Sequence, residues 1–181
     1  MNKFSVKTIV AIGIGAALFF VLGRFVMIPS PVPNTNISIQ YGVLAFFAAV
    51  FGPVAGALIG LIGHTLIDLS WGSPWWSWII ASGVFGLLVG CGAKVLKFNF
   101  ENKVKGLVKF NICQVIVHII CWGVVAPGLD ILIYSEPVEK IFLQGLVAGI
   151  ANAVTTAIVG SILLIAYAAR KPKDGSLKAE E

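Results

Sequence analysis

The sequence contains few charged residues, since Lys, Arg, Asp and Glu together make up 12% of its 181 residues. That is about half the share found in an ordinary soluble domain. Hydrophobic residues make up 58%, and 20 glycines add to the apolar content. A soluble fold of this length leaves too much of its surface in water to hide such a composition. The sequence therefore excludes a soluble globular domain and predicts an all-α integral membrane protein, with the lipid bilayer as its solvent.

Cysteine and histidine are also scarce, with three and two residues respectively. The cysteines lie in apolar segments without a pairing pattern or metal-ligand spacing, so we expect them to act as small hydrophobic residues. A metal site built from His64, Asp68 and His118 is one alternative, but no tight ligand motif surrounds these residues. We expect no metal and no cofactor.

Several functional motifs are missing from the sequence. No GxxxxGK[ST] is present to hold a nucleotide phosphate, and no HExxH is present. There is no credible Ser/His arrangement, because nothing in the sequence brings Ser82 and His118 together. The first apolar segment starts near Thr8 and is too long for a signal-peptide core, so it is expected to remain as a membrane span. The sequence thus predicts neither an enzyme nor a nucleic-acid-binding protein.

Membrane spans can be counted from the apolar runs, because a helix needs about 20 apolar residues to cross the hydrocarbon core. Runs between charges and Gly or Pro breaks predict six spans, at residues 6–28, 38–51, 53–70, 76–97, 107–126 and 141–168. The segment 38–70 could instead form one tilted helix, although Pro53 directly after Gly52 favours a break.

The distribution of lysine and arginine favours six spans over five. Positive residues collect in cytoplasmic loops. With a turn at Gly52–Pro53, eleven of the 13 lysines and arginines fall on one side of the membrane. The opposite loops, 29–37, 71–75 and 127–140, then hold only Lys140. The sequence therefore predicts one transmembrane domain over residues 1–169, a six-helix bundle with both termini cytoplasmic, and a polar cytoplasmic tail at 170–181.

Small residues mark the expected helix contacts. In the third span, four glycines fall on one face within about 80° of the helix circumference, at positions 52, 56, 60 and 63. Such a face lets another helix backbone approach closely.

The first span carries two small-residue pairs on opposite faces. Gly13 and Ala17 share a face with Arg24, and an arginine within a span is expected to face protein or water. We therefore expect this face to point inward. Ala11 and Gly15 would then point outward, toward a partner helix or simply toward lipid.

The stretch "GHTLIDLSWGSPWWSW", residues 63–78, places His64 and Asp68 in the outer half of the third span. Four tryptophans follow within eight residues. An interfacial aromatic belt explains any one of them, but four exceed what anchoring a single helix requires. A ligand site below an aromatic mouth is the alternative that we favour.

Further polar residues are expected to reach the same volume. They are Asn111, Gln114, His118 and Trp122 in the fifth span, Gln144, Asn152 and Thr155 in the sixth, and Arg24 at the outer end of the first. The loop "MIPSPVPNTNISIQY" contains three prolines and is stiff enough to form a shaped flap. A buried ionisable group costs several kcal/mol unless it is paired or solvated. The polar residues could simply satisfy one another, or they could line an outward-opening pocket for a flat heteroaromatic molecule.

Four stretches of the sequence resemble a known family: "SVKTIVAIGIGAALFFVLGRF", "VPNTNI", "FGPVAGALIGLIGHTLIDL" and "WGSPWWSWIIASGVFGLLVG". They are similar to the substrate-binding S components of energy-coupling factor (ECF) vitamin transporters, closest to the riboflavin-type and hydroxymethylpyrimidine-type subfamily. The resemblance covers nearly the whole chain and is most specific over residues 52–90. It implies a multi-pass receptor in a prokaryotic plasma membrane that binds a vitamin outside. A transmembrane T component and two ATP-binding subunits would drive its delivery inward.

The resemblance also implies roles for individual residues. The family's small-residue motif that meets the T component maps to Ala11 and Gly15, and its flap maps to residues 29–39. From the positions of the polar and aromatic residues, we expect Trp75 and Trp122 to stack on the ligand, and Arg24 and Asn34 to help close the flap. Hydrogen bonds to the ligand are expected from His64, Asp68, His118 and Asn152.

The identity of the vitamin does not follow from the resemblance. Hydroxymethylpyrimidine and pyridoxine are the first candidates for the ligand, and riboflavin and cobalamin are the next. A solitary proton-coupled carrier that uses His64 and Asp68 as a relay is the alternative function.

Overall fold

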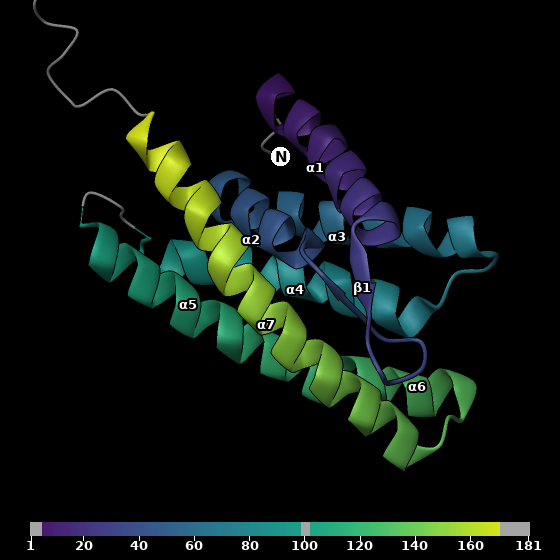
Figure 1. The fold of residues 1–181 in the computed structure, drawn as a ribbon. Helices are drawn as coiled ribbons and strands as arrows, with labels where there is room; N and C mark the ends of the chain where they lie inside the picture. The colour runs from purple at the N-terminus through teal and green to yellow at the C-terminus, as the bar shows by residue number, and fades with distance from the viewer. Residues whose placement is uncertain (1–4, 99–101, 171–181) are drawn as a thin grey trace, which may run out of the picture.

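The computed structural model describes residues 5–98 and 102–170 and is helical apart from one short hairpin (Figure 1). The predicted tail lies outside these residues from position 171 onward. The elements are α1 (Val6–Phe25), β1 (Met27–Pro29), β2 (Asn36–Ser38), α2 (Gln40–Phe51), α3 (Pro53–Trp71), α4 (Trp76–Val95), α5 (Lys103–Ile120), the π-helical turn η1 (Cys121–Val125), α6 (Ala126–Tyr134) and α7 (Val138–Ala169).

The helices confirm the all-α membrane fold. Five helical stretches are long and apolar enough to cross a membrane: α1, α3, α4, the continuous stretch 103–134, and α7. The apolar helix α2 has only 12 residues, about 18 Å at 1.5 Å per residue, which is shorter than the hydrocarbon core. The sixth span and the cytoplasmic position of both termini stay predictions.

The chain breaks between α2 and α3 where the sequence predicts it. Gly52 has φ +94°, a backbone conformation that L side chains rarely adopt. Pro53 follows as the first residue of α3, where its missing N–H has no helical partner to lose. These two residues end one helix and start the next without an intervening loop.

The predicted outer loop over residues 127–140 is wrong for most of its length. Helix α6 occupies Ala126–Tyr134 in direct continuation of α5 and η1, and α7 already begins at Val138. Pro127 does not end the helix, because the wide π-helical turn precedes it. Such a turn removes the regular backbone bonding that a proline ring would disrupt.

The bundle has α1 on one flank, α2, α3 and α4 in the middle, and the long helices α5 and α7 side by side on the other flank (Figure 1). The glycine face of α3 lets neighbouring helices approach closely, as the sequence predicts. Its first part meets α4, whereas Gly63 meets Phe19 of α1. A Cβ atom on Gly56 would lie 2.5 Å from the backbone oxygen of Gly86, and one on Gly86 would collide with the Gly56 carbonyl in turn. The two backbones therefore touch directly.

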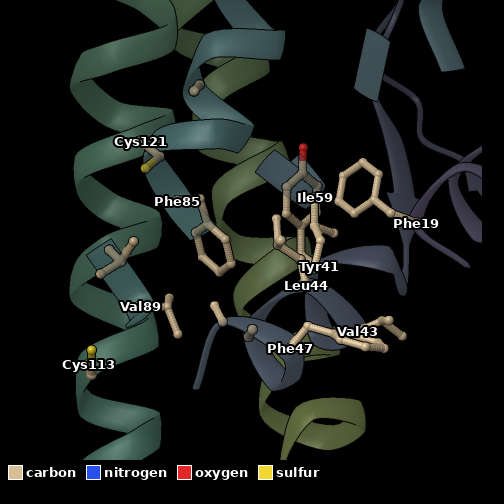
Figure 2. Close-up of a cluster of buried hydrophobic side chains, with 14 of the residues drawn as sticks. Phe19, Tyr41, Val43, Leu44, Phe47, Ile59, Phe85, Val89, Cys113 and Cys121 are labelled. Atoms are coloured by element: carbon tan, nitrogen blue, oxygen red, sulfur yellow. The ribbon is translucent and has the colours of Figure 1, made fainter. Parts of the chain in front are cut away.

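Aromatic side chains fill the centre of the bundle (Figure 2). The ring of Tyr41 lies edge-on to Phe19, with centroids 5.3 Å apart, and to Phe85 at 5.6 Å. Cys113 and Cys121 are buried among apolar groups, and the three cysteines are free, as expected. The hydrophobic core therefore occupies the middle of the bundle. The cavity lies at the end of the bundle near the hairpin.

The α3–α4 backbone contact predicts that Gly56→Val lowers thermal stability strongly. Its added atoms meet a carbonyl, which cannot move aside as a flexible side chain could. Overpacking of this kind costs about 1–3 kcal/mol or more. Gly13→Val is the matched control, because a Cβ at Gly13 has no neighbour within 4 Å. Equal melting temperatures for the two purified variants would contradict this account of the packing.

Candidate functional site

A cavity of about 780 Å³ lies beneath the β1–β2 hairpin, between the ends of α3, α4, α6 and α7. Its lining combines indole rings, carboxylates and carboxamides. The polar and aromatic lining residues include Asn34, Gln40, Tyr41, His64, Asp68, Trp71, Trp75, Trp78, Asp130, Glu136, Lys140, Gln144 and Asn152. This volume lies within the range of about 300–1,000 Å³ typical of small-molecule sites.

Asp130 on α6 fixes the aromatic wall of the cavity. Its side chain is only 2% exposed. The indole Nε1–H of Trp75 donates to Oδ1 at 2.7 Å, and that of Trp78 donates to Oδ2 at 2.8 Å. The Ser77 hydroxyl also donates to Oδ1. Hydrogen bonds to a carboxylate are about twice as strong as neutral ones, so Asp130 sets the positions of both indoles.

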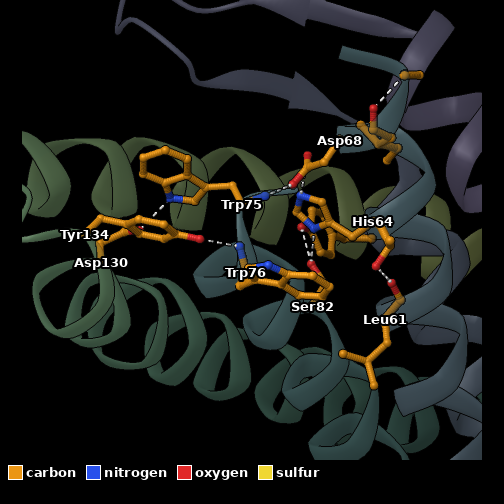
Figure 3. Close-up of polar contacts among 12 residues, drawn as sticks. Leu61, His64, Asp68, Trp75, Trp76, Ser82, Asp130 and Tyr134 are labelled. Atoms are coloured by element: carbon orange, nitrogen blue, oxygen red, sulfur yellow. Dashed lines mark hydrogen bonds and ion pairs between the residues drawn. The ribbon is translucent and has the colours of Figure 1, made fainter. Parts of the chain in front are cut away.

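Asp68 on α3 fixes the loop that leads into α4 (Figure 3). The backbone N–H of Trp75 donates to its Oδ2 at 2.8 Å. The Trp75 ring stacks on Tyr134, with centroids 4.1 Å apart and an interplanar angle of 24°. The Tyr134 hydroxyl oxygen in turn accepts from the backbone N–H of Trp76 at 2.9 Å. The ends of α3, α4 and α6 thus form one connected rim.

His64 joins the cavity to the core. Its Nε2 lies 3.6 Å from Asp68 Oδ1, and its Nδ1 lies 2.6 Å from Ser82 Oγ. Ser82 Oγ is also hydrogen-bonded to the Tyr41 hydroxyl at 2.9 Å. Ser82 is 0% exposed and does not line the cavity. The structure pairs Ser82 with His64, and not with His118, the histidine considered in the sequence analysis.

The hairpin that covers the cavity is tied to α7. Gln144 Nε2 donates to the Pro33 carbonyl at 2.8 Å, and the Thr155 hydroxyl donates to the Ser38 carbonyl at 2.9 Å. β1 and β2 pair antiparallel, with Ile28 opposite Ile37. The predicted flap is therefore an ordered ribbon held at both its tip and its base.

The cavity contains five of the eight side chains that the sequence predicts as ligand-binding. They are Asn34, His64, Asp68, Trp75 and Asn152.

The other three predicted residues, Arg24, His118 and Trp122, lie outside the lining. Arg24 places its guanidinium 3.8 Å from the centroid of the Trp71 ring. His118 and Trp122 are each 1% exposed. The ring of Trp122 stacks behind Trp78, with centroids 5.3 Å apart. His118 and Trp122 thus form a layer behind the cavity wall, because the stripe on α5 packs against α4 and α7.

The orientation predicted for α1 is reversed. Ala11 and Gly15 are buried, and Gly15 packs against Ile59 of α3. Gly13 and Ala17 are exposed instead. The prediction fails because Arg24 packs on an aromatic ring at the end of the helix, so it does not force its whole face inward.

Sequence reasoning missed Gln40, Tyr41, Trp78 and Asp130 as lining residues. The signal for Asp130 was present, since it is the only ionisable residue within "VVAPGLDILIY" apart from the terminal tyrosine. A lone carboxylate in an apolar stretch requires partners. Gln40 and Tyr41 carry no comparable signal, because only the chain reversal after the hairpin brings the start of α2 to the cavity.

The family model for the ECF-type riboflavin transporter S component matches residues 3–169. The chain belongs to this S component family. An S component is the membrane-embedded receptor subunit of a bacterial transporter and not a catalytic enzyme, which agrees with the sequence-based expectation.

Close relatives of this S component occur in Gram-positive bacteria. A UPF0397 protein of Enterococcus faecalis is 53% identical, covering 99% of both chains. One from Leuconostoc citreum is 52% identical over 98% of this chain and 95% of the relative. One from Clostridium perfringens is 51% identical over 99% of this chain and 98% of the relative. Each of these relatives is matched over nearly its whole length.

The bonds to Asp130 predict that Asp130→Asn loosens the aromatic wall. The amide keeps the shape of the side chain, but its NH2 group would face at least one of the donors. Losing hydrogen bonds to a charged group costs about 1.5–3 kcal/mol each. We expect a lower melting temperature and a red-shifted tryptophan emission. Glu136→Gln is the control, since the side chain of Glu136 bonds only Lys140 among the described residues. An unchanged emission spectrum in Asp130→Asn would contradict the proposed role of Asp130.

Proposed function

We propose that this S component binds a small heteroaromatic vitamin or vitamin precursor in the cavity beneath the hairpin. The ligand would enter from the outer side, and a T component with two ATP-binding subunits would drive its delivery inward. The size of the cavity and the three indoles in its lining, Trp71, Trp75 and Trp78, support a flat ring as ligand. Family membership supports the transport role.

The observation that carries the proposal is a pair of carboxamides on the cavity wall. The Oε1 atom of Gln40 and the Oδ1 atom of Asn152 are buried and have no hydrogen-bond partner among the described residues. A buried polar atom without a partner costs about 1–3 kcal/mol. A ligand that donates hydrogen bonds to these two atoms would recover that free energy, and it would bridge α2 and α7.

Ligand size ranks the candidates. Hydroxymethylpyrimidine and pyridoxine are single rings with donor groups at their edges, so they match the two carboxamide oxygens and come first. Riboflavin offers a wider ring system for the indoles and comes next. Cobalamin is much larger than the others and comes last.

A solitary proton-coupled carrier remains the second candidate, because His64 and Asp68 are neighbours and connect to Ser82. Uptake by vesicles that contain only this chain, abolished by an uncoupler, would support the carrier. Uptake that requires the T component and ATP would support the S component function.

We predict that Asp68→Ala weakens binding of the tightest ligand by at least tenfold, about 1.4 kcal/mol. The substitution removes the acceptor of the Trp75 backbone N–H and a carboxylate of the cavity wall. Binding of hydroxymethylpyrimidine, pyridoxine and riboflavin to purified protein would be measured by quenching of tryptophan fluorescence. The same affinity in the variant and the wild type would remove Asp68 from the site.

We further propose that the exposed pair Gly13 and Ala17 on α1 meets the T component, in place of the buried Ala11 and Gly15. Gly13→Leu combined with Ala17→Leu should abolish ATP-dependent uptake in the assembled transporter and leave ligand binding unchanged. Ala166→Leu is the control, because Ala166 is an exposed alanine at the end of α7. Normal uptake in the double variant would exclude this face as the partner surface.

A further inference from the structure

The lining of the cavity carries more negative than positive charge. Three carboxylates contribute to it, Asp68, Asp130 and Glu136, whereas Lys140 is the only lysine or arginine in the lining. Lys140 Nζ is already paired with Glu136 Oε2 at 2.6 Å. Among the described residues, no lysine or arginine forms an ion pair with Asp68 or Asp130. Asp68 and Asp130 are therefore without a lysine or arginine partner in this part of the chain, and the basic group that the structure places near Asp68 is His64.

The two carboxylates differ in how much bonding capacity remains. Asp130 is 2% exposed and already accepts from three donors. Asp68 has a side chain that is 15% exposed, and its Oδ2 accepts one backbone N–H. Its Oδ1 has no hydrogen bond among the described residues, since His64 Nε2 lies 3.6 Å away, which is too long for one. Asp68 is thus the carboxylate that can accept from a ligand.

The aromatic wall suits a positive charge as well. The face of an indole ring attracts cations, and tryptophan does so more strongly than the other aromatic residues. Trp71 belongs to the lining, and the guanidinium of Arg24 already lies 3.8 Å from the centroid of its ring. Trp71 lies three residues after Asp68, at the end of the same helix. Arg24 therefore occupies one face of Trp71, and a cation held by Asp68 would rely on the other indoles of the lining, Trp75 and Trp78.

The unpartnered atoms of the wall point to the same kind of ligand. Gln40 Oε1 and Asn152 Oδ1 are acceptors, as is Asp68 Oδ1, so the free positions of the site call for hydrogen-bond donors. A protonated amine supplies both donors and charge. An ionised carboxylate in this apolar bundle costs several kcal/mol unless it is paired, and a cationic ligand would pair it.

We propose that the ligand of this S component carries a positive charge, as an ammonium group or a cationic ring nitrogen, and that Asp68 binds this charge beside the indole wall. The inference rests on the proposed function, because it specifies the class of ligand for the same cavity. It ranks amine-bearing or cationic heteroaromatic compounds above neutral ones of the same size.

A matched pair of probes tests the charge directly. Pyridoxamine and pyridoxine share one ring and differ by an ammonium group in place of a hydroxyl. Binding of each to the full chain in lipid nanodiscs at pH 7 would be measured by calorimetry. We expect pyridoxamine to bind at least ten times more tightly. In Asp68→Asn, which keeps the shape of the side chain, the affinities for pyridoxamine and pyridoxine should differ by less than about threefold. The tenfold preference expected of the wild type corresponds to about 1.4 kcal/mol.

Glu139→Gln is the matched control, because Glu139 is an exposed carboxylate of α7 that does not line the cavity. It should leave the preference for pyridoxamine intact. Equal or tighter binding of pyridoxine by the wild type would overturn the inference, as would a preference that survives in Asp68→Asn. The wild-type comparison decides the question even if the variant fails to fold.

The same experiment separates this inference from the proposed function. Thiamine, with its cationic thiazolium ring, and neutral riboflavin would be measured as a second pair. Tight binding of riboflavin or pyridoxine, with weak binding of thiamine and pyridoxamine, would overturn the charge preference and leave vitamin binding intact. Failure of all four probes to bind would count against both.

Discussion

The site depends on one buried carboxylate. Asp130 accepts hydrogen bonds from Trp75, Ser77 and Trp78, all at the start of α4. Removing a carboxylate from water is tolerated only when its lone pairs are satisfied. The requirement acts in both directions, because the indole N–H groups also need acceptors inside an apolar bundle. Asp130 thereby joins α6 to α4 and holds two aromatic rings at the cavity.

The rim built on these bonds is continuous with the flap. Helix α7 contributes Gln144 and Thr155, whose side chains bind the backbone of the hairpin at Pro33 and Ser38. The same helix contributes Asn152 to the cavity wall. A shift of α7 along its axis would therefore alter the hairpin and the ligand contacts together. Helix α7 therefore connects the hairpin at the entrance of the cavity with the cavity wall.

The sequence predicted those parts of the fold that follow from local chemistry. The membrane environment followed from composition, and the break between α2 and α3 followed from Gly52 and Pro53. The spaced glycines predicted a close helix contact, although not that α4 would be the partner. His64 and Asp68 could be placed together because residues four apart share a helix face.

The errors arose where a side chain had a partner that no local pattern reveals. Arg24 packs on an aromatic ring instead of an acid, and this reversed the predicted face of α1. The polar stripe of α5 faces other helices, so His118 and Trp122 lie behind the wall. The predicted site omitted Asp130, because the sequence predicts a loop where the structure has α6. Tertiary contacts decided each of these cases.

The π-helical turn at Cys121–Val125 has a consequence for how this part of the chain can change over time. Each residue of a helix turns the following residues by about 100°. Loss of one residue from the turn would rotate α6 by that angle and carry Asp130 away from the indoles. The length of the turn is therefore constrained by a carboxylate in the helix that follows it.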